Sequence, residues 1–355
     1  MNQVWSVMKT PEISIVIPIY NTAKYLRPCL ESCVGQTLEN IQILCVDHAS
    51  TDGSRSILEE FAARDSRIQI IDCPNTGGGP GQARNAAFPH ILGVYTYFAD
   101  SDDWLDTQLC EKACARMDET GCDILLLDFH PVTEQGRATR QIKSVQHAFP
   151  RSGRNGIRYL DYLCAPWTRV LRTFFIKKHD LRYLEGCMPE DHYFHWIQMA
   201  NDPHVEILDE KLYYYRLLEF SQIGKKGEYV ARTPQIFPPI REYLEKNNCY
   251  SRFREKYIAD KVNCIYNAYY SVRPEYRTLC KTLALQSLRK DEIPGLCQSK
   301  AIPHHRKTFL LALAGSKRAK FFMLFQNINQ CLFRPWIRKL EKLIKHAEKK
   351  SSSIW

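Results

Sequence analysis

Short apolar runs alternate with helical patterns along the first hundred residues, and polar residues follow most of the runs. The apolar runs predict strands at 13–18, 41–46, 68–72 and 94–99, and the residues between them predict helices at 24–37, 57–64 and 82–87. This alternation is typical of a mostly parallel sheet with helices on both faces. Such sheets bind ligands outside the carboxyl ends of their strands. We therefore expect the site beside Pro18, Tyr20, Asp47 and residues 100–103.

Three carboxylates directly follow the fourth expected strand. Asp100 and Asp102 are one residue apart, so both can face one ligand if the backbone turns there, and Asp103 follows. Carboxylate oxygens suit Mg²⁺ or Mn²⁺, and magnesium usually completes its shell with water and substrate phosphates. The alternative is a set of acidic caps for a helix that would begin near Trp104. The residues alone leave both interpretations open.

Four segments, in this order and spacing, resemble the family 2 glycosyltransferases, inverting enzymes with a GT-A fold. They are IVIPIYN at 15–21, CVDHASTDGS at 45–54, GQARN at 81–85 and DSDDW at 100–104. APWTR at 165–169, PED at 189–191 and LYYYR at 212–216 resemble the acceptor side of bacterial members that build capsule, lipopolysaccharide or other surface glycans. The resemblance extends over about residues 12–221.

The resemblance implies an α/β fold of the GT-A type, a mostly parallel mixed sheet flanked by helices. We expect a lead at 1–11 and a glycosyltransferase domain at 12–224, with a donor half at about 12–130 and an acceptor half at about 155–224. Residues 225–355 are expected to be a mostly helical, basic appendage. The polar segment 131–154 predicts a mobile loop near the acceptor side.

The resemblance also implies roles for individual residues. The nucleotide-sugar donor would contact Pro18, Tyr20, Asp47, His48, Arg84 and Asp100, and Mn²⁺ or Mg²⁺ would be held by Asp102 and Asp100. On the acceptor side, Asp191 would be the general base, accompanied by Glu190 and Trp167. Local sequence offers an alternative for three of them: Asp191 as the cap of a helix at 193–200, Arg84 as a surface residue and Trp167 as a core anchor.

His48 departs from the family pattern. Most relatives have Asp-Asp-Gly-Ser where this chain has Asp47-His48-Ala49-Ser50, and the second aspartate normally accepts the N3 proton of uracil. A neutral histidine accepts a hydrogen bond through one nitrogen only. Uracil could therefore still bind through His48 or Asp47, another base could be used, or donor binding could be lost. Because Asp100, Asp102 and Asp191 are all retained, we expect a UDP-sugar donor.

The glycines and cysteines indicate no further cofactor. Residues 77–81 complete neither a dinucleotide fingerprint nor a P-loop. Fourteen cysteines include no Cys-x-x-Cys pair, and both Cys29/Cys33 and Cys110/Cys114 have helical spacing, which favours buried hydrophobes over zinc ligands or disulfides. The chain begins without a signal-like segment and has no apolar run of about 20 residues, so we expect a cytoplasmic protein with reduced thiols.

The end of the chain carries most of the net positive charge. From Lys300 to Trp355 there are thirteen Lys and Arg against two Glu. Apolar residues at 336, 337, 340, 343 and 344 have helical spacing, with basic residues largely on the other side. This pattern predicts a helix that binds an anionic membrane surface, which would make the enzyme peripheral on the inner face of the cytoplasmic membrane. The alternative is a helix packed on the catalytic domain; no nucleic-acid motif accompanies the charge.

Two functions from different classes follow. The first is an inverting glycosyltransferase that moves a sugar from a UDP-sugar to a hydroxyl of a glycan or lipid-linked acceptor in bacterial surface polysaccharide or lipopolysaccharide synthesis. The second is a non-catalytic relative that binds nucleotide or membrane as an assembly partner. The retained carboxylates favour the enzyme.

Overall fold

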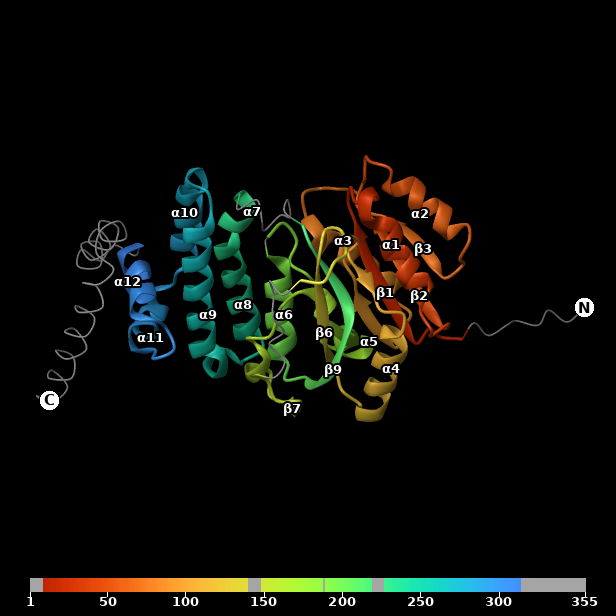
Figure 1. Ribbon diagram of the computed structural model, residues 1–355. Helices are drawn as coiled ribbons and strands as arrows, with labels where there is room; N and C mark the ends of the chain where they lie inside the picture. Colours follow the sequence, from red (N-terminus) through yellow and green to blue (C-terminus); the bar gives the residue numbers. More distant parts are fainter. Residues whose placement is uncertain (1–8, 140–147, 188, 219–226, 314–355) are drawn as a thin grey trace, which may run out of the picture. The chain divides into compact units, whose positions relative to one another are not determined.

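The computed structural model describes residues 9–139, 148–187, 189–218 and 227–313 (Figure 1). The chain divides into two compact units, Met1–Arg254 and Glu255–Trp355. The first unit thus extends past the boundary at 224 expected from the sequence. Helix α8 (Phe237–Lys246) belongs with this unit because it packs on α6 (Glu190–Ala200), where Tyr243 accepts a hydrogen bond from the Asn201 amide just beyond α6.

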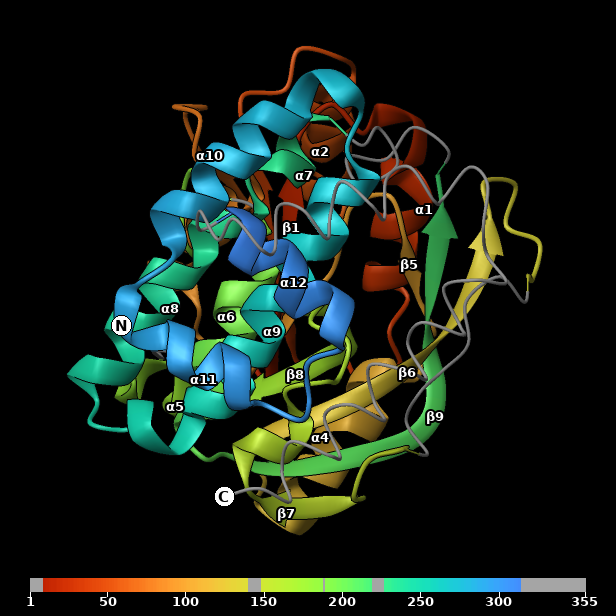
Figure 2. The ribbon, with the colours of Figure 1, turned by 90° about the vertical axis from the view of Figure 1, so that its left-hand side faces the viewer.

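The first unit is built on a mixed nine-stranded sheet in the order β3-β2-β1-β4-β8-β6-β9-β5, with β7 paired to β9 (Figures 1 and 2). The strands β1 to β4 are mutually parallel where they pair, and β8 then pairs antiparallel with both β4 and β6. The expected α/β class with a mixed sheet is confirmed. The strands are β1 (Ile13–Ile19), β2 (Ile41–Asp47), β3 (Ile68–Asp72), β4 (Tyr95–Phe98), β5 (Trp104–Leu105), β6 (Ile124–Thr133), β7 (Ser152–Arg154), β8 (Arg169–Arg172) and β9 (His204–Leu217).

Helices cover both faces of this sheet (Figure 1). α1 buries Leu26, Cys29, Leu30 and Cys33 against the core, and α4 buries Cys110 and Cys114 in the same way. These four cysteines are unpaired, so the prediction of buried hydrophobes is confirmed. The remaining bounds are α1 (Ala23–Val34), α2 (Ser54–Ala62), α3 (Gly79–Ala87), α4 (Leu109–Thr120), α5 (Thr173–Lys178) and α7 (Glu228–Ala231).

Two local predictions are wrong. No helix begins near Trp104, because Trp104 and Leu105 form β5, which pairs antiparallel with Tyr214 and Tyr213 of β9, and α4 begins only at Leu109. The segment 131–154 is not a loop at either end: β6 continues to Thr133 alongside β9, and β7 pairs with the start of β9. Both errors arise because β9 supplies hydrogen-bonding partners that are distant in sequence.

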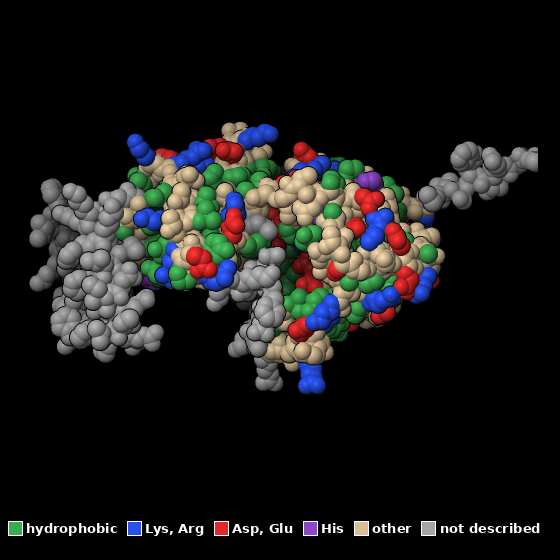
Figure 3. All heavy atoms as spheres, turned by 90° about the horizontal axis from the view of Figure 1, so that it is seen from above, with side chains coloured by type: hydrophobic (Ala, Val, Ile, Leu, Met, Phe, Trp, Pro, Cys, Tyr) green, Lys and Arg blue, Asp and Glu red, His purple; other side chains and the backbone are tan. Residues whose placement is uncertain are grey.

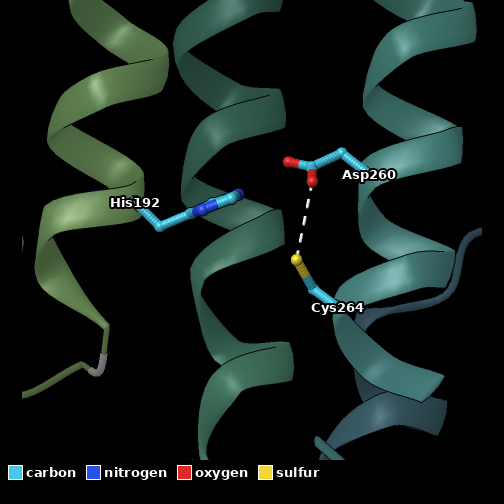
Figure 4. Close-up of side chains that lie close together, drawn as sticks. All are labelled: His192, Asp260 and Cys264. Carbon is cyan, nitrogen blue, oxygen red and sulfur yellow. Dashed lines mark hydrogen bonds between the residues drawn. The ribbon is translucent and has the colours of Figure 1, made fainter. Parts of the chain in front are cut away.

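The described part of the second unit is helical, as expected, with α9 (Tyr250–Ser271) entering from the first unit, then α10 (Arg277–Ser287), α11 (Ile293–Gln298) and α12 (His304–Leu313). Lys261 and Glu292 form a buried ion pair at 2.7 Å. On α9, Cys264 donates a hydrogen bond to Asp260 one turn away (Figure 4). None of the helices in the described ranges is long and apolar enough to cross a membrane. The predicted membrane-binding segment lies outside these ranges.

Gly93 allows the chain before β4 to approach β1 closely. A Cβ at this position would lie 2.4 Å from the backbone nitrogen of Ser14. We therefore predict that Gly93→Ala lowers the free energy of unfolding by about 2 kcal/mol in urea titrations, as expected for overpacking against backbone. Gly53→Ala is the control, because its Cβ would meet nothing closer than the Cβ of Ala23 at 3.7 Å. Equal losses in the two variants would contradict the prediction.

Candidate active site at the carboxyl ends of the strands

The turn at residues 100–103 is held by β9. Asp103 is 1% exposed and accepts hydrogen bonds from the Tyr213 hydroxyl at 2.8 Å and the Arg216 backbone nitrogen at 2.6 Å. The Tyr213 hydroxyl also accepts from the Asp100 backbone nitrogen at 3.2 Å. Burial, and then the charges of Asp102 and Asp100, raise the pKa of Asp103. Asp103 therefore stabilises the turn, and Asp100 and Asp102 are left for a ligand.

Arg216 adds a second connection to the same turn. Its Nε donates to the carbonyl oxygen of Asp102 at 2.8 Å, and its guanidinium lies 4.7 Å from the centre of the Trp104 ring. From the sequence, Tyr213 and Arg216 belonged to an acceptor-side segment. Their contact with the carboxylate turn was missed, because the only signal for it is the pairing of β5 with β9.

The carboxylates of this turn form one acidic cluster. Oxygens of Asp100, Asp102 and Asp103 lie within 4.8 Å of one another. Burial, and then the charge of Asp100, raise the pKa of Asp102 to about 6. A divalent cation would relieve this repulsion, and oxygen ligands are those that Mg²⁺ and Mn²⁺ prefer. On the face seen in Figure 3, acidic side chains are visible inside a hollow. The helix-cap alternative is wrong, because Gln108 precedes α4.

Arg84, on α3, connects the two expected halves of the site. It is 3% exposed, so the surface alternative is wrong. One terminal nitrogen of its guanidinium donates to Asp100 at 2.8 Å, and the other donates to Glu190 at 2.9 Å and to Asp191 at 3.1 Å. A single planar, permanently charged group therefore holds the donor-side and acceptor-side carboxylates at a set separation.

Glu190 and Asp191 lie in the first turn of α6, which follows Pro189. The cap alternative for Asp191 is wrong, because Pro189 occupies the cap position. Glu190 is 2% exposed, and its second carboxylate oxygen has no hydrogen-bond partner among the described residues. Burial, and then Glu190, raise the pKa of Asp191, which Arg84 opposes. A carboxylate with a raised pKa is a stronger general base.

The expected nucleotide residues meet at the ends of β1 and β2. Tyr20 follows β1 and is 51% exposed, and its ring centre lies 5.9 Å from that of His48. His48 and Asp47 are buried, and Asp47 accepts a hydrogen bond from the Ser50 backbone nitrogen at 3.1 Å. Pro18 lies near the end of β1. This edge of the sheet therefore combines an exposed aromatic ring with buried polar groups.

Trp167 lies in the core of the sheet. Its ring is 3% exposed and is stacked between Tyr213, with centres 4.7 Å apart, and Tyr215, with centres 4.9 Å apart. This is the placement that the core-anchor alternative describes. A role for Trp167 in acceptor binding stays a prediction.

Comparison with known proteins relates this chain to a family of enzymes. Residues 14–179 match the family model described as Glycosyl transferase family 2. This segment is a family 2 glycosyltransferase domain. It is similar to EpsH of Bacillus subtilis (strain 168), with 28% identity over 257 residues, 70% of this chain and 74% of EpsH. It is also 28% identical over 207 residues to TarS of Staphylococcus aureus, named a poly(ribitol-phosphate) beta-N-acetylglucosaminyltransferase, covering 58% of this chain and 35% of that glycosyltransferase.

Solved structures of glycosyltransferases agree on the fold. The structure of TarS residues 1–349 in complex with UDP-GlcNAc superimposes with a TM-score of 0.68 at 20% identity, covering 85% of this chain and 87% of that one. The mannosyltransferase PcManGT of Pyrobaculum calidifontis, in complex with GDP-Man and Mn²⁺, gives a TM-score of 0.50 at 14% identity and covers 86% of each chain. The sheet and its helices are thus of the GT-A type expected from the sequence.

Removing the Arg84 guanidinium should destabilise this glycosyltransferase. Arg84→Met would leave the buried Glu190 carboxylate without its cation, a change that typically costs about 3 kcal/mol or more. We expect this loss in the free energy of unfolding measured by urea titration. Arg151→Met is the control, because Arg151 pairs with Asp209 at 2.6 Å in an exposed position. This substitution should lower the free energy of unfolding by less than about 1 kcal/mol. Similar losses in the two variants would contradict a stabilising role for the buried ion pairs of Arg84.

Proposed function

We propose that this glycosyltransferase transfers a sugar from a UDP-sugar to an acceptor hydroxyl with inversion at the anomeric carbon. The observation that carries the proposal is the set of ion pairs made by the Arg84 guanidinium, here called the Arg84 clamp. It holds Asp100, at the expected donor site, and Asp191, the expected base, on one guanidinium. The TarS complex with UDP-GlcNAc supports the choice of a uridine donor for a chain of this fold.

On the donor side, Pro18, Tyr20, Asp47 and His48 would bind the nucleoside. Asp102 and Asp100 would hold Mn²⁺ or Mg²⁺, in keeping with the Mn²⁺ named with PcManGT and with the clustering of these carboxylates. When bound, the cation supplies a positive charge that stabilises the departing nucleoside diphosphate. Arg84 restrains Asp100, and Tyr213 and Arg216 restrain the turn that presents both carboxylates.

On the acceptor side, Asp191 would accept the proton of the attacking hydroxyl. The hydroxyl oxygen forms a bond to the anomeric carbon as the bond from that carbon to the phosphate oxygen breaks, so the diphosphate leaves with the bonding electrons. Arg84 and the first turn of α6 orient the Asp191 carboxylate for this transfer. Glu190, with one oxygen unpaired among the described residues, is a candidate to contact the acceptor.

The acceptor is proposed to be a glycan or lipid-linked intermediate of a bacterial surface polysaccharide. TarS, whose name specifies a poly(ribitol-phosphate) acceptor, supports a surface polymer as the class. We further propose that the reaction takes place in the cytoplasm, with the basic segment after residue 320 attaching the enzyme to the inner face of the membrane. That proposal rests on sequence pattern alone, because the segment lies outside the described residues.

Asp102→Asn tests the metal site. The amide keeps the size of the side chain and removes the charge needed to hold a dication, so Mn²⁺-dependent transfer should fall at least about a hundredfold. The measurement is UDP release from a UDP-sugar across a Mn²⁺ titration, with a melting curve to verify folding. Asp209→Asn, at an exposed position on β9, is the control. Undiminished transfer by Asp102→Asn would contradict the assignment.

Asp191→Asn tests the general base. Turnover should fall about a hundredfold or more while the affinity for the donor nucleotide changes little, because the lost proton acceptor serves the acceptor hydroxyl. Turnover and calorimetric UDP binding are measured on the same preparation. Asp180→Asn, an exposed residue paired with Arg182, provides the control. Loss of UDP binding would instead place Asp191 in the donor site or in the maintenance of the fold.

A further inference from the structure

Gln82, on α3, has a side-chain amide whose orientation is set by the backbone. Its oxygen lies 3.1 Å from the backbone nitrogen of Gly78 and 3.4 Å from that of Thr76, and both nitrogens can only donate. Its amide nitrogen donates to the Thr76 hydroxyl at 2.7 Å. A Cβ on Gly78 would lie 2.6 Å from the Cβ of Gln82, so this packing requires glycine. The oxygen of Gln82 is therefore the atom that faces the Gly78 turn.

The same oxygen determines the tautomer of His48. Nε2 of His48 lies 3.1 Å from the Gln82 oxygen, which has no proton to give, so Nε2 must carry the hydrogen. In a neutral imidazole the other nitrogen, Nδ1, then has a free lone pair. The hydrogen bond that the His48 ring makes to a described residue uses Nε2, and the side chain is buried at the end of β2. The chain thus presents a free hydrogen-bond acceptor there.

The acceptor lies beside an exposed aromatic surface. The Tyr20 ring is half exposed and tilted by 60° relative to the His48 ring. A flat ligand resting on Tyr20 can direct the ring nitrogen of its pairing edge toward His48, and that ring nitrogen must carry a hydrogen to pair with Nδ1. Uracil carries one at N3 and guanine at N1, whereas N3 of cytosine and N1 of adenine are acceptors and would oppose the lone pair.

We propose that Gln82 is a specificity-determining residue: it holds His48 in the Nε2–H tautomer, so that the donor site selects a nucleobase with a ring N–H and rejects cytosine and adenine. This inference rests on the proposed nucleotide-sugar function and deepens it for uracil. Gln82 acts through His48 and is a positioning residue. With its tautomer fixed by Gln82, a neutral His48 can accept this one hydrogen bond as a carboxylate would.

Binding of free UDP and CDP to the full chain in Mn²⁺, measured by calorimetry, tests the proposal. The native protein should bind UDP about tenfold or more tightly than CDP, because CDP would leave a buried acceptor facing another acceptor. Gln82→Met removes the oxygen and releases the tautomer, so the ratio should fall severalfold. Gln69→Met is the matched control: Gln69 faces Nδ1 of His90 at 3.3 Å in an exposed pair and should leave the ratio unchanged.

Rescue separates the tautomer from a packing effect. The double variant His48→Asp with Gln82→Met should bind UDP as tightly as His48→Asp alone, because a carboxylate accepts without needing a tautomer. Long-range ¹H–¹⁵N correlation spectra should show the Nε2–H tautomer of His48 in the native protein and a mixture in Gln82→Met. An unchanged UDP-to-CDP ratio in Gln82→Met, or an Nδ1–H tautomer in the native protein, would overturn the inference.

The failure of the proposed donor is distinguishable from the failure of this inference. Equal binding of UDP and CDP refutes the role of Gln82 and leaves a uridine donor possible for turnover assays to establish. Preference for GDP over UDP, with CDP still rejected, refutes the uridine donor and supports the ring N–H rule.

Discussion

The three-carboxylate clamp on Arg84 is the interaction on which the rest of the site depends. Its guanidinium is buried and donates hydrogen bonds to Glu190 and Asp191, which lie more than 100 positions further along the chain. Taking one cation and its partner carboxylates out of water is favourable only when their hydrogen bonds are well made. The clamp therefore fixes α3, the end of β4 and the start of α6 relative to one another, and with them the distance between the donor side and the expected base.

The second constraint comes from β9. Through Tyr213 and Arg216 this strand holds the turn at 100–103 and leaves Asp103 fully occupied. Burial, and then the charge of Asp100, raise the pKa of Asp102. A bound cation would relieve the repulsion between the carboxylates of this cluster. Trp167 stacks between Tyr213 and Tyr215 of the same strand, and Tyr213 also donates to Asp103, which links the core to the site.

The positions of the strands in the sequence predict which of the expected nucleotide and carboxylate residues lie near one another. Pro18, Tyr20, Asp47 and Asp100 each lie at or next to the carboxyl end of a parallel strand. Parallel strands bring their carboxyl ends to one edge, so the proximity of these residues could be predicted. The role of Gln82 beside His48 could not be, because the contact depends on a turn around Gly78 that carries no periodic signal. The prediction of a helix near Trp104 was wrong because residues 104 and 105 pair with β9, a strand distant in sequence.

The sequence by itself determined the α/β class, the family resemblance and the residue types that the chemistry requires, because alternation and short motifs are local properties. Tertiary structure decided which of those residues pair with one another and which are buried. Arg84 binds Asp100, Glu190 and Asp191 rather than lying at the surface, and Trp167 is in the core. Only folding brings such distant groups within hydrogen-bonding distance and removes the water that would otherwise separate and screen them.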